Sequence, residues 1–143
     1  MRGPRPTHRR IRTVIVDDSP VVVKSLERFF KERDGFDVVG FAGTGTEAVR
    51  EAGRLKPDLV VMDIRMPKMD GLEATRRIKA GKGAPVVIVF TLENNLAART
   101  AAKEAGADDF VAKAPNVYRA LEGALGRAFP RVKAERHGAG KAA

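Results

Sequence analysis

The stretch Leu59-Val60-Val61-Met62-Asp63-Ile64-Arg65-Met66-Pro67 decides the fold of this chain. Its first four residues are apolar, and two of them are valine. That composition and length are typical of a strand buried on both faces of a parallel sheet. Asp63 follows at the point where the strand ends. Because ligands bind beyond the carboxyl ends of the strands in an open α/β sheet, Asp63 is predicted to border a binding crevice.

Three other apolar runs share this pattern of a short strand followed at once by a polar side chain. They are Thr13–Val16 before Asp17 and Asp18, Val86–Phe90 before Thr91, and Phe110–Ala112 before Lys113. Strand ends on one edge of a sheet would bring three carboxylates, a hydroxyl and an amine together. Such a set of groups is suited to holding a divalent cation and handling a phosphoryl group.

Strand and helix patterns alternate five times along the chain. The expected strands are Thr13–Val16, Phe36–Phe41, Leu59–Met62, Val86–Phe90 and Asp109–Ala112. The expected helices are Pro20–Glu32, Glu47–Arg54, residues 71–81, Asn95–Ala105 and Asn116–Ala128, and Pro130 is expected to close the fold. This alternation predicts an α/β fold, a doubly wound (βα)5 parallel sheet in the flavodoxin-like order 2-1-3-4-5. The glycines of residues 43–46 lack the third glycine of a dinucleotide-binding loop, which favours a turn and helix cap.

Composition restricts the classes of protein. The chain of 143 residues has the size of one domain and contains no cysteine, which excludes disulfides and thiolate chemistry. No apolar run approaches a membrane span, and the basic N-terminus lacks the apolar stretch of a secretory signal. We therefore expect a cytoplasmic protein without a membrane partner.

The formal net charge of +9 comes from the two ends, since Thr13–Gly126 is neutral. We expect residues 1–11 and 130–143 to be flexible, solvated basic tails. An alternative is that they steer the protein toward nucleic acid. With no DNA-reading module in the sequence, such binding would be nonspecific and salt-dependent.

Four motifs resemble the receiver domain of two-component response regulators, a CheY-like superfamily, in its single-domain type. The matching pieces are Val16–Ser19, Val61–Gly71, Phe90-Thr91 and Gly106–Lys113. They lie in the order and spacing of the family, and the resemblance extends from Arg12 to Ala128. We therefore expect a receiver domain over residues 12–129.

The resemblance implies a site in which Asp63 is the phosphoacceptor. Asp18 and Asp63 would be direct carboxylate ligands of Mg²⁺, with Mn²⁺ as a possible substitute. Asp17 would act mainly through water, and the backbone carbonyl of Arg65 would complete the protein ligands. Lys113 and the Thr91 hydroxyl would bind the phosphoryl oxygens. Taken singly, each of these residues also fits a helix cap or a solvated sheet end.

The resemblance also implies a switch. Thr91 would move toward the new phosphoryl oxygen, and Phe110 occupies the position of the aromatic switch residue. Because phenylalanine has no hydroxyl, its rotamer would be governed by packing alone. The alternative is a core aromatic without a switching role. The expected readout surface is formed by the helix Asn95–Ala105, the strand Asp109–Ala112 and the helix Asn116–Ala128, and includes Arg99, Lys103, Phe110 and Arg119.

Two positions depart from the family pattern. Leu92 follows Thr91 where a small residue is usual, and Ala114 intervenes between Lys113 and Pro115. A cis bond before Ala114 would cost about 3 kcal/mol, so we expect a trans bond or a rearranged loop. Arg65 and Glu93 carry opposite charges at the mouth and are predicted to pair. Together with Leu92 they would shield the aspartyl phosphate and make it long-lived.

The function predicted first is that of a stand-alone receiver that takes a phosphoryl group from a histidine kinase or a phosphotransfer domain and binds an unknown downstream protein. It would be a monomer or a phosphorylation-dependent dimer. It would not be an enzyme, except that it would catalyse its own phosphorylation and autodephosphorylation. The alternative is an interaction module that keeps the fold but does not switch.

Overall fold

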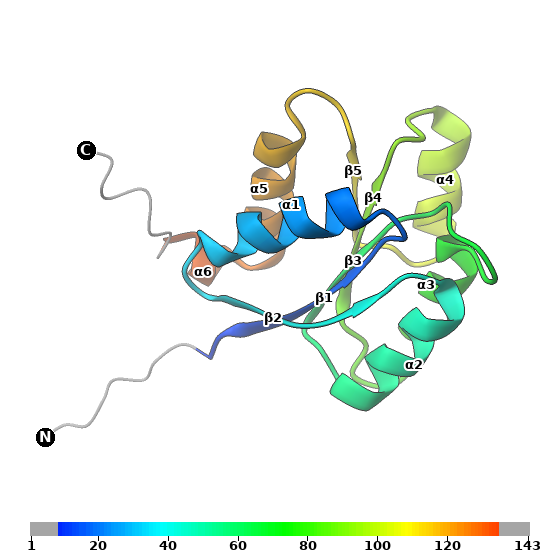
Figure 1. Ribbon diagram of the computed structural model, residues 1–143, viewed down its shortest axis with the longest axis horizontal. Coiled ribbons are helices and arrows are strands. Elements are labelled where there is room, and N and C mark those ends of the chain that lie inside the picture. Colours follow the sequence, from blue (N-terminus) through cyan, green and yellow to red (C-terminus); the bar gives the residue numbers. More distant parts are fainter. Residues whose placement is uncertain (1–8, 135–143) are drawn as a thin grey trace, which may run out of the picture.

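The computed structural model describes residues 9–134, which form one five-stranded sheet in the order β2-β1-β3-β4-β5 (Figure 1). All neighbouring strands pair in parallel. The strands are β1 (Ile11–Val16), β2 (Phe36–Ala42), β3 (Leu59–Met62), β4 (Val86–Thr91) and β5 (Asp109–Ala112). The doubly wound (βα)5 sheet and its 2-1-3-4-5 order, predicted from the alternation of patterns, are confirmed.

The helices cover both faces of the sheet, with α1 and α5 on one face and α2, α3 and α4 on the other (Figure 1). They are α1 (Pro20–Lys31), α2 (Gly45–Leu55), α3 (Gly71–Lys79), α4 (Leu96–Glu104), α5 (Val117–Ala128) and α6 (Pro130–Ala134). Successive strand residues serve opposite faces, as Ile15 packs with α1 while Val14 and Val16 pack toward α2 and α3. Within residues 9–134, no helix combines the length and hydrophobicity needed to cross a membrane.

The loop before α2 is a helix cap, as the sequence predicted. The Thr44 hydroxyl accepts a hydrogen bond from the Glu47 backbone N–H at 3.0 Å, and the Glu47 carboxylate accepts one from the Gly43 N–H at 2.7 Å. This pair resembles a capping box, except that the Glu47 carboxylate accepts the N–H of the residue before the N-cap Thr44. It starts α2 at Gly45, two residues before the predicted start at Glu47.

The folded region extends beyond the expected bounds of residues 12–129 at both ends. Ile11 belongs to β1, where its N–H donates to the Gly35 carbonyl at 2.7 Å. Pro130 does not close the fold: it occupies the first turn of α6, a position that needs no backbone N–H. Val132 of α6 is buried in the core cluster that includes Phe30 and Phe36. The flexibility predicted for residues 1–8 and 135–143 lies outside the described residues.

Gly35 makes the docking of α6 possible. Its φ of +97° lies in the region that glycine adopts without strain, and a Cβ built there would lie 2.6 Å from Val132 Cγ1. A side chain at this position would therefore displace Val132. The turn between α1 and β2 is shaped around the last helix of the described chain.

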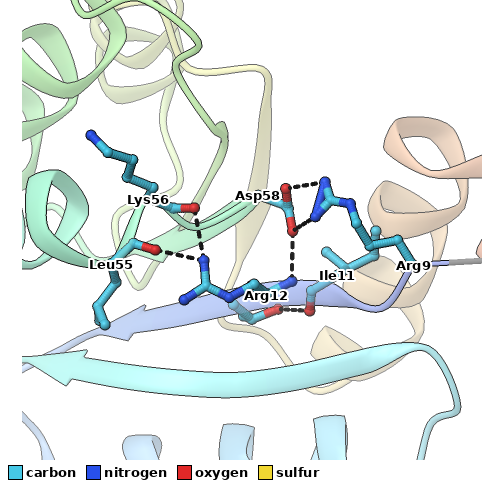
Figure 2. Close-up of polar contacts among 7 residues, drawn as sticks. Arg9, Ile11, Arg12, Leu55, Lys56 and Asp58 are labelled. Carbon is cyan, nitrogen blue, oxygen red and sulfur yellow. Dashed lines mark hydrogen bonds and ion pairs between the residues drawn. The ribbon is translucent and has the colours of Figure 1, made fainter.

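Arg9, just before β1, and Arg12, within β1, are not free solvated charges. Arg9 donates two hydrogen bonds to the Asp58 carboxylate, at 2.8 and 3.2 Å, and the Arg12 N–H donates to the same group at 2.9 Å (Figure 2). The Arg12 guanidinium donates to the carbonyls of Leu55 and Lys56, where a cation complements the helix dipole at the C-terminus of α2 (Figure 2). The expected flexible tail therefore becomes ordered at Arg9.

Candidate functional site: an acidic cluster at the carboxyl edge of the sheet

Three carboxylates meet where β1 and β3 end. Asp17 and Asp18 follow β1 and Asp63 follows β3, and one carboxylate oxygen from each lies within 4.8 Å of the others. Backbone hydrogen bonds continue past the strands and hold these positions: the Asp17 N–H donates to the Ala42 carbonyl and the Asp63 N–H to the Val16 carbonyl, both at 3.0 Å. The cluster predicted from strand ends is thus formed by rigid backbone.

The amine and the hydroxyl reach the same cluster from β4 and β5. Lys113 lies directly after β5, and its backbone N–H donates to the Thr91 carbonyl at 2.8 Å. Its ammonium lies 2.8 Å from Asp17 Oδ2 and 3.7 Å from Asp63 Oδ2. The Phe90 ring, with its centroid 5.6 Å from Nζ, adds a cation–π contact. The structure therefore brings all five predicted side chains together.

Asp17 and Asp18 have different surroundings. Asp17 is 4% exposed, and both of its oxygens are occupied: Oδ1 accepts the Ser19 N–H at 3.0 Å and Oδ2 accepts Lys113. Asp18 is exposed, and among residues 9–134 its carboxylate has no hydrogen bond or ion pair. Asp18 can therefore offer its oxygens to a cation without breaking a contact, whereas Asp17 cannot.

The pKa of Asp63 is raised above its ordinary value, chiefly because the carboxyl group is buried. Lys113 and a hydrogen bond from Thr91 lower the pKa, while the nearby charge of Asp17 raises it. The cluster itself holds three carboxylates, and Lys113 is the one described ammonium paired with them. A divalent cation would supply the missing positive charge, which is the chemical basis for a metal site here.

Gly71 lies at the site, and the sequence reasoning used it as a helix start and as the last residue of a matching motif without giving it a role there. A Cβ at this position would lie 1.9 Å from the carbonyl oxygen of Asp63, and the Gly71 N–H donates to the Ile64 carbonyl at 2.8 Å. The first turn of α3 therefore passes directly against the backbone of Asp63. The signal that could have revealed it is the Asp70-Gly71 pair, a helix cap followed by the residue that allows close backbone approach.

Comparison with known proteins agrees with this geometry. The family model described as "Response regulator receiver domain" matches residues 13–122. The chain belongs to this receiver family. The receiver domain of CheB from Thermotoga maritima superimposes with a TM-score of 0.74 at 33% identity, covering 88% of this chain and 98% of that one. The receiver domain of a sensor histidine kinase from Pseudomonas aeruginosa, crystallised with a magnesium ion in its active site cleft, superimposes with a TM-score of 0.72 at 31% identity. This match covers 82% of this chain and 96% of that one.

Curated relatives match the receiver as a part of longer proteins. A protein-glutamate methylesterase/protein-glutamine glutaminase from a Nocardioides strain is 40% identical over 125 residues, which is 86% of this chain and 33% of the relative. A putative transcriptional regulator from Pseudomonas aeruginosa is 40% identical over 77% of this chain and 53% of its own length. The chain thus spans about a third of the first relative and about half of the second, and the shared part is the receiver.

Arg65 and Glu93 pair across the mouth of the receiver site, as their charges predicted. Arg65 Nε donates to Glu93 Oε2 at 2.8 Å, and a second guanidinium nitrogen donates to the same oxygen. This contact raises the pKa of Arg65. Leu92 is 76% exposed, so most of its side chain faces solvent rather than the carboxylates. No described peptide bond is cis, as expected for the bond between Lys113 and Ala114.

Phe110 lies beside this site in the receiver, half-buried on β5. It packs against the cluster formed by Ile64, Val89, Ala98 and Ala102. That packing alone governs its rotamer stays a prediction, and the Arg99 guanidinium lies over the ring with Cζ 4.5 Å from the ring centroid. Sequence reasoning placed Arg99 on the readout surface and missed this contact, which depends on the three-dimensional distance between α4 and β5.

Proposed function

We propose that this receiver accepts a phosphoryl group on Asp63, with Mg²⁺ bound, from a histidine kinase or a phosphotransfer domain. The observation that carries the proposal is the convergence of Asp17, Asp18 and Asp63 with Lys113 and Thr91. Attack by a carboxylate on a phosphoryl group meets charge repulsion, so the site must supply positive charge and hydrogen-bond donors. The three carboxylate oxygens within 4.8 Å of one another support a site that is completed by a cation.

The donor set fits Mg²⁺. It offers hard oxygen ligands, and Asp18 is exposed with no described partner. We assign Asp18 and Asp63 as direct ligands, with the Arg65 backbone carbonyl. Asp17, whose oxygens are both occupied, would act through water. Mn²⁺ is the natural substitute. When bound, the ion neutralises charge between the carboxylates and the phosphoryl oxygens.

The chain's own residues then perform the transfer. An Asp63 oxygen forms the bond to phosphorus, the phosphorus–nitrogen bond of the donor histidine breaks, and the leaving imidazole takes up a proton. The Lys113 ammonium, already between Asp17 and Asp63, binds one phosphoryl oxygen. The Thr91 hydroxyl donates to another. The only chemistry proposed for this chain is its own phosphorylation and autodephosphorylation, in which water later attacks the phosphorus.

The output is proposed to pass through α4, β5 and α5, where Thr91 and Phe110 transmit the change to Arg99, Lys103 and Arg119. A separate downstream protein, or a second copy in a phosphorylation-dependent dimer, would bind there. Stand-alone action stays a prediction, because the curated relatives carry the matching region within longer chains. The size of the native product, measured by immunoblot of cells that express the gene, tests it.

The decisive experiment is the intact mass after incubation with a small phosphodonor and Mg²⁺. The wild type should gain one phosphoryl group, and Asp63→Asn should gain none. Asp18→Asn is the matched variant for the metal, and should need a higher Mg²⁺ concentration. Absence of both mass gain and Mg²⁺ binding in the wild type would instead favour a non-switching interaction module. A mass gain that persists in Asp63→Asn would refute the assignment of the acceptor.

A further inference from the structure

Helix α4 is attached to the sheet by very little apolar area. Its buried residues are Ala98 and Ala102, whereas α1 buries Leu26 and Phe30. Burial stabilises roughly in proportion to the apolar area removed from water, so two alanines hold α4 weakly. Any additional contact between α4 and its neighbours therefore has a large share in setting its position.

Arg99 makes such contacts with two different segments. Its Nε and a terminal guanidinium nitrogen both donate to Asn94 Oδ1, at 3.1 and 3.0 Å. Its guanidinium also lies over the Phe110 ring at 4.5 Å. Asn94 lies in the loop between β4 and α4, three residues after Thr91, while Phe110 belongs to β5. One side chain thus joins the loop, the helix and the neighbouring strand.

We propose that Arg99 is a positioning residue that couples the loop after Thr91 to the ring of Phe110. This inference rests on the proposed function, since it concerns how phosphorylation at Asp63 would reach the output surface. Phe110 has no hydroxyl through which to sense a moving neighbour. The guanidinium supplies the missing polar connection: when the loop moves toward a phosphoryl group, Asn94 draws Arg99 away from the ring, and the ring is released.

The coupling has a definite sign. In this proposal phosphorylation breaks the contact between Arg99 and the Phe110 ring, so the contact favours the arrangement that precedes phosphorylation. Removing the guanidinium should lower the cost of switching and tighten the binding of a phosphoryl mimic. Because an exposed cation–π contact is weak, the expected gain in affinity is about two- to five-fold.

The test uses the full chain labelled with ring-¹³C phenylalanine and observed by NMR. Seven phenylalanines are present, and the signal of Phe110 is assigned by its loss in Phe110→Leu. Beryllium trifluoride with Mg²⁺ serves as the phosphoryl mimic. Arg99→Met keeps an unbranched stem and removes the guanidinium. Lys103→Met is the matched control, because it removes a cation one turn along α4 that has no side-chain hydrogen bond or ion pair within residues 9–134.

In Arg99→Met, the Phe110 signal of the free protein should shift part of the way toward its position in the mimic-bound wild type. The mimic should bind two to five times more tightly, and Lys103→Met should match the wild type in both respects. Asn94→Ala should also tighten binding, because it cuts the same connection at the loop. Arg99→Lys, which keeps the charge but not the planar fork, should restore the wild-type behaviour only in part.

Two results would overturn the coupling: a Phe110 signal and mimic affinity unchanged in Arg99→Met, or equal changes in Arg99→Met and Lys103→Met. Failure of the proposed function is distinguishable from failure of the coupling. If the wild type gains no phosphoryl mass on Asp63 and does not respond to the mimic, the function itself is refuted. A normal mass gain with unaltered variants refutes the role of Arg99 alone.

Discussion

The ion pair between Arg65 and Glu93 should lengthen the life of an aspartyl phosphate by a small and calculable factor. Both donors of Arg65 converge on one oxygen of Glu93, but the Arg65 side chain is 73% exposed and Glu93 30%. Exposed pairs contribute about 0.2–1 kcal/mol. If water can reach Asp63 only after the pair opens, removing the pair lowers the hydrolytic barrier by that amount. The decay rate should then rise by about 1.4- to 5-fold.

The assay follows the phosphorylated mass after the phosphodonor is removed. Arg65→Asn should decay faster than the wild type within that range. The exchanged pair, Arg65→Glu with Glu93→Arg, should recover most of the lifetime. Leu92→Ala should have a smaller effect than Arg65→Asn, because a side chain that is 76% exposed covers little of the entrance. Salt should shorten the wild-type lifetime and leave Arg65→Asn unaffected, since screening weakens an exposed pair.

Unchanged decay in both Arg65→Asn and Leu92→Ala would refute the shielding idea. So would an acceleration well beyond tenfold in Arg65→Asn, because an exposed pair does not hold that much free energy. In the latter case Arg65 would act on the reaction by another route, such as a direct effect on the metal ligands.

Three further predictions concern stability. Because burial raises the pKa of Asp63, its ionised form destabilises the fold above that pKa and protonation relieves the cost. In metal-free buffer at pH 8, Asp63→Asn should therefore raise the free energy of unfolding, measured in urea, by about 0.5–2 kcal/mol. At pH 3 the substitution should not change it. An equal rise in the free energy of unfolding at both pH values would contradict this reasoning. Val132→Ala removes two buried carbons and should cost about 1.5 kcal/mol in the same assay, and no loss would show that α6 is not docked in solution. The buried Thr75 hydroxyl has no hydrogen-bond partner among residues 9–134, so Thr75→Val should be neutral or stabilise by up to about 1 kcal/mol. A clear loss of stability would reveal a further partner such as water.

The sheet could be predicted from the sequence because a buried strand is recognisable from the apolar residues of the strand itself. Leu59–Met62 is fully buried and uniformly apolar, and a polar residue ends each strand that feeds the site. The position of Asp63 beside Asp17 follows from the strand order, which in turn follows from alternation and right-handed connection. Fold and candidate site were therefore accessible to reasoning from short-range pattern and topology.

The ends of the domain were not accessible in this way. A proline such as Pro130 can end a helix, but it also suits the first turn of a new one. Val132 can dock in the core because Gly35 has no side chain to occupy its place. Charge counting likewise assigned Arg9 to a free tail, because its partner Asp58 lies 49 positions away. The contact between Arg99 and Phe110 was missed for the same reason. Each depends on distances between elements, which residue order alone does not contain.

The docking of α6 places both ends of the described chain on the side of the molecule away from the acceptor. Arg9, which precedes β1, and Val132 line the same hollow. The six residues of β1 separate that hollow from the acidic cluster by about 20 Å. A label, surface tether or fused protein attached at Arg9 or at Ala134 would leave the entrance to Asp63 open. Because Arg9 and Val132 line one hollow, the described domain is a natural candidate for circular permutation, with a linker joining residues 9 and 134 and new ends cut in an exposed loop.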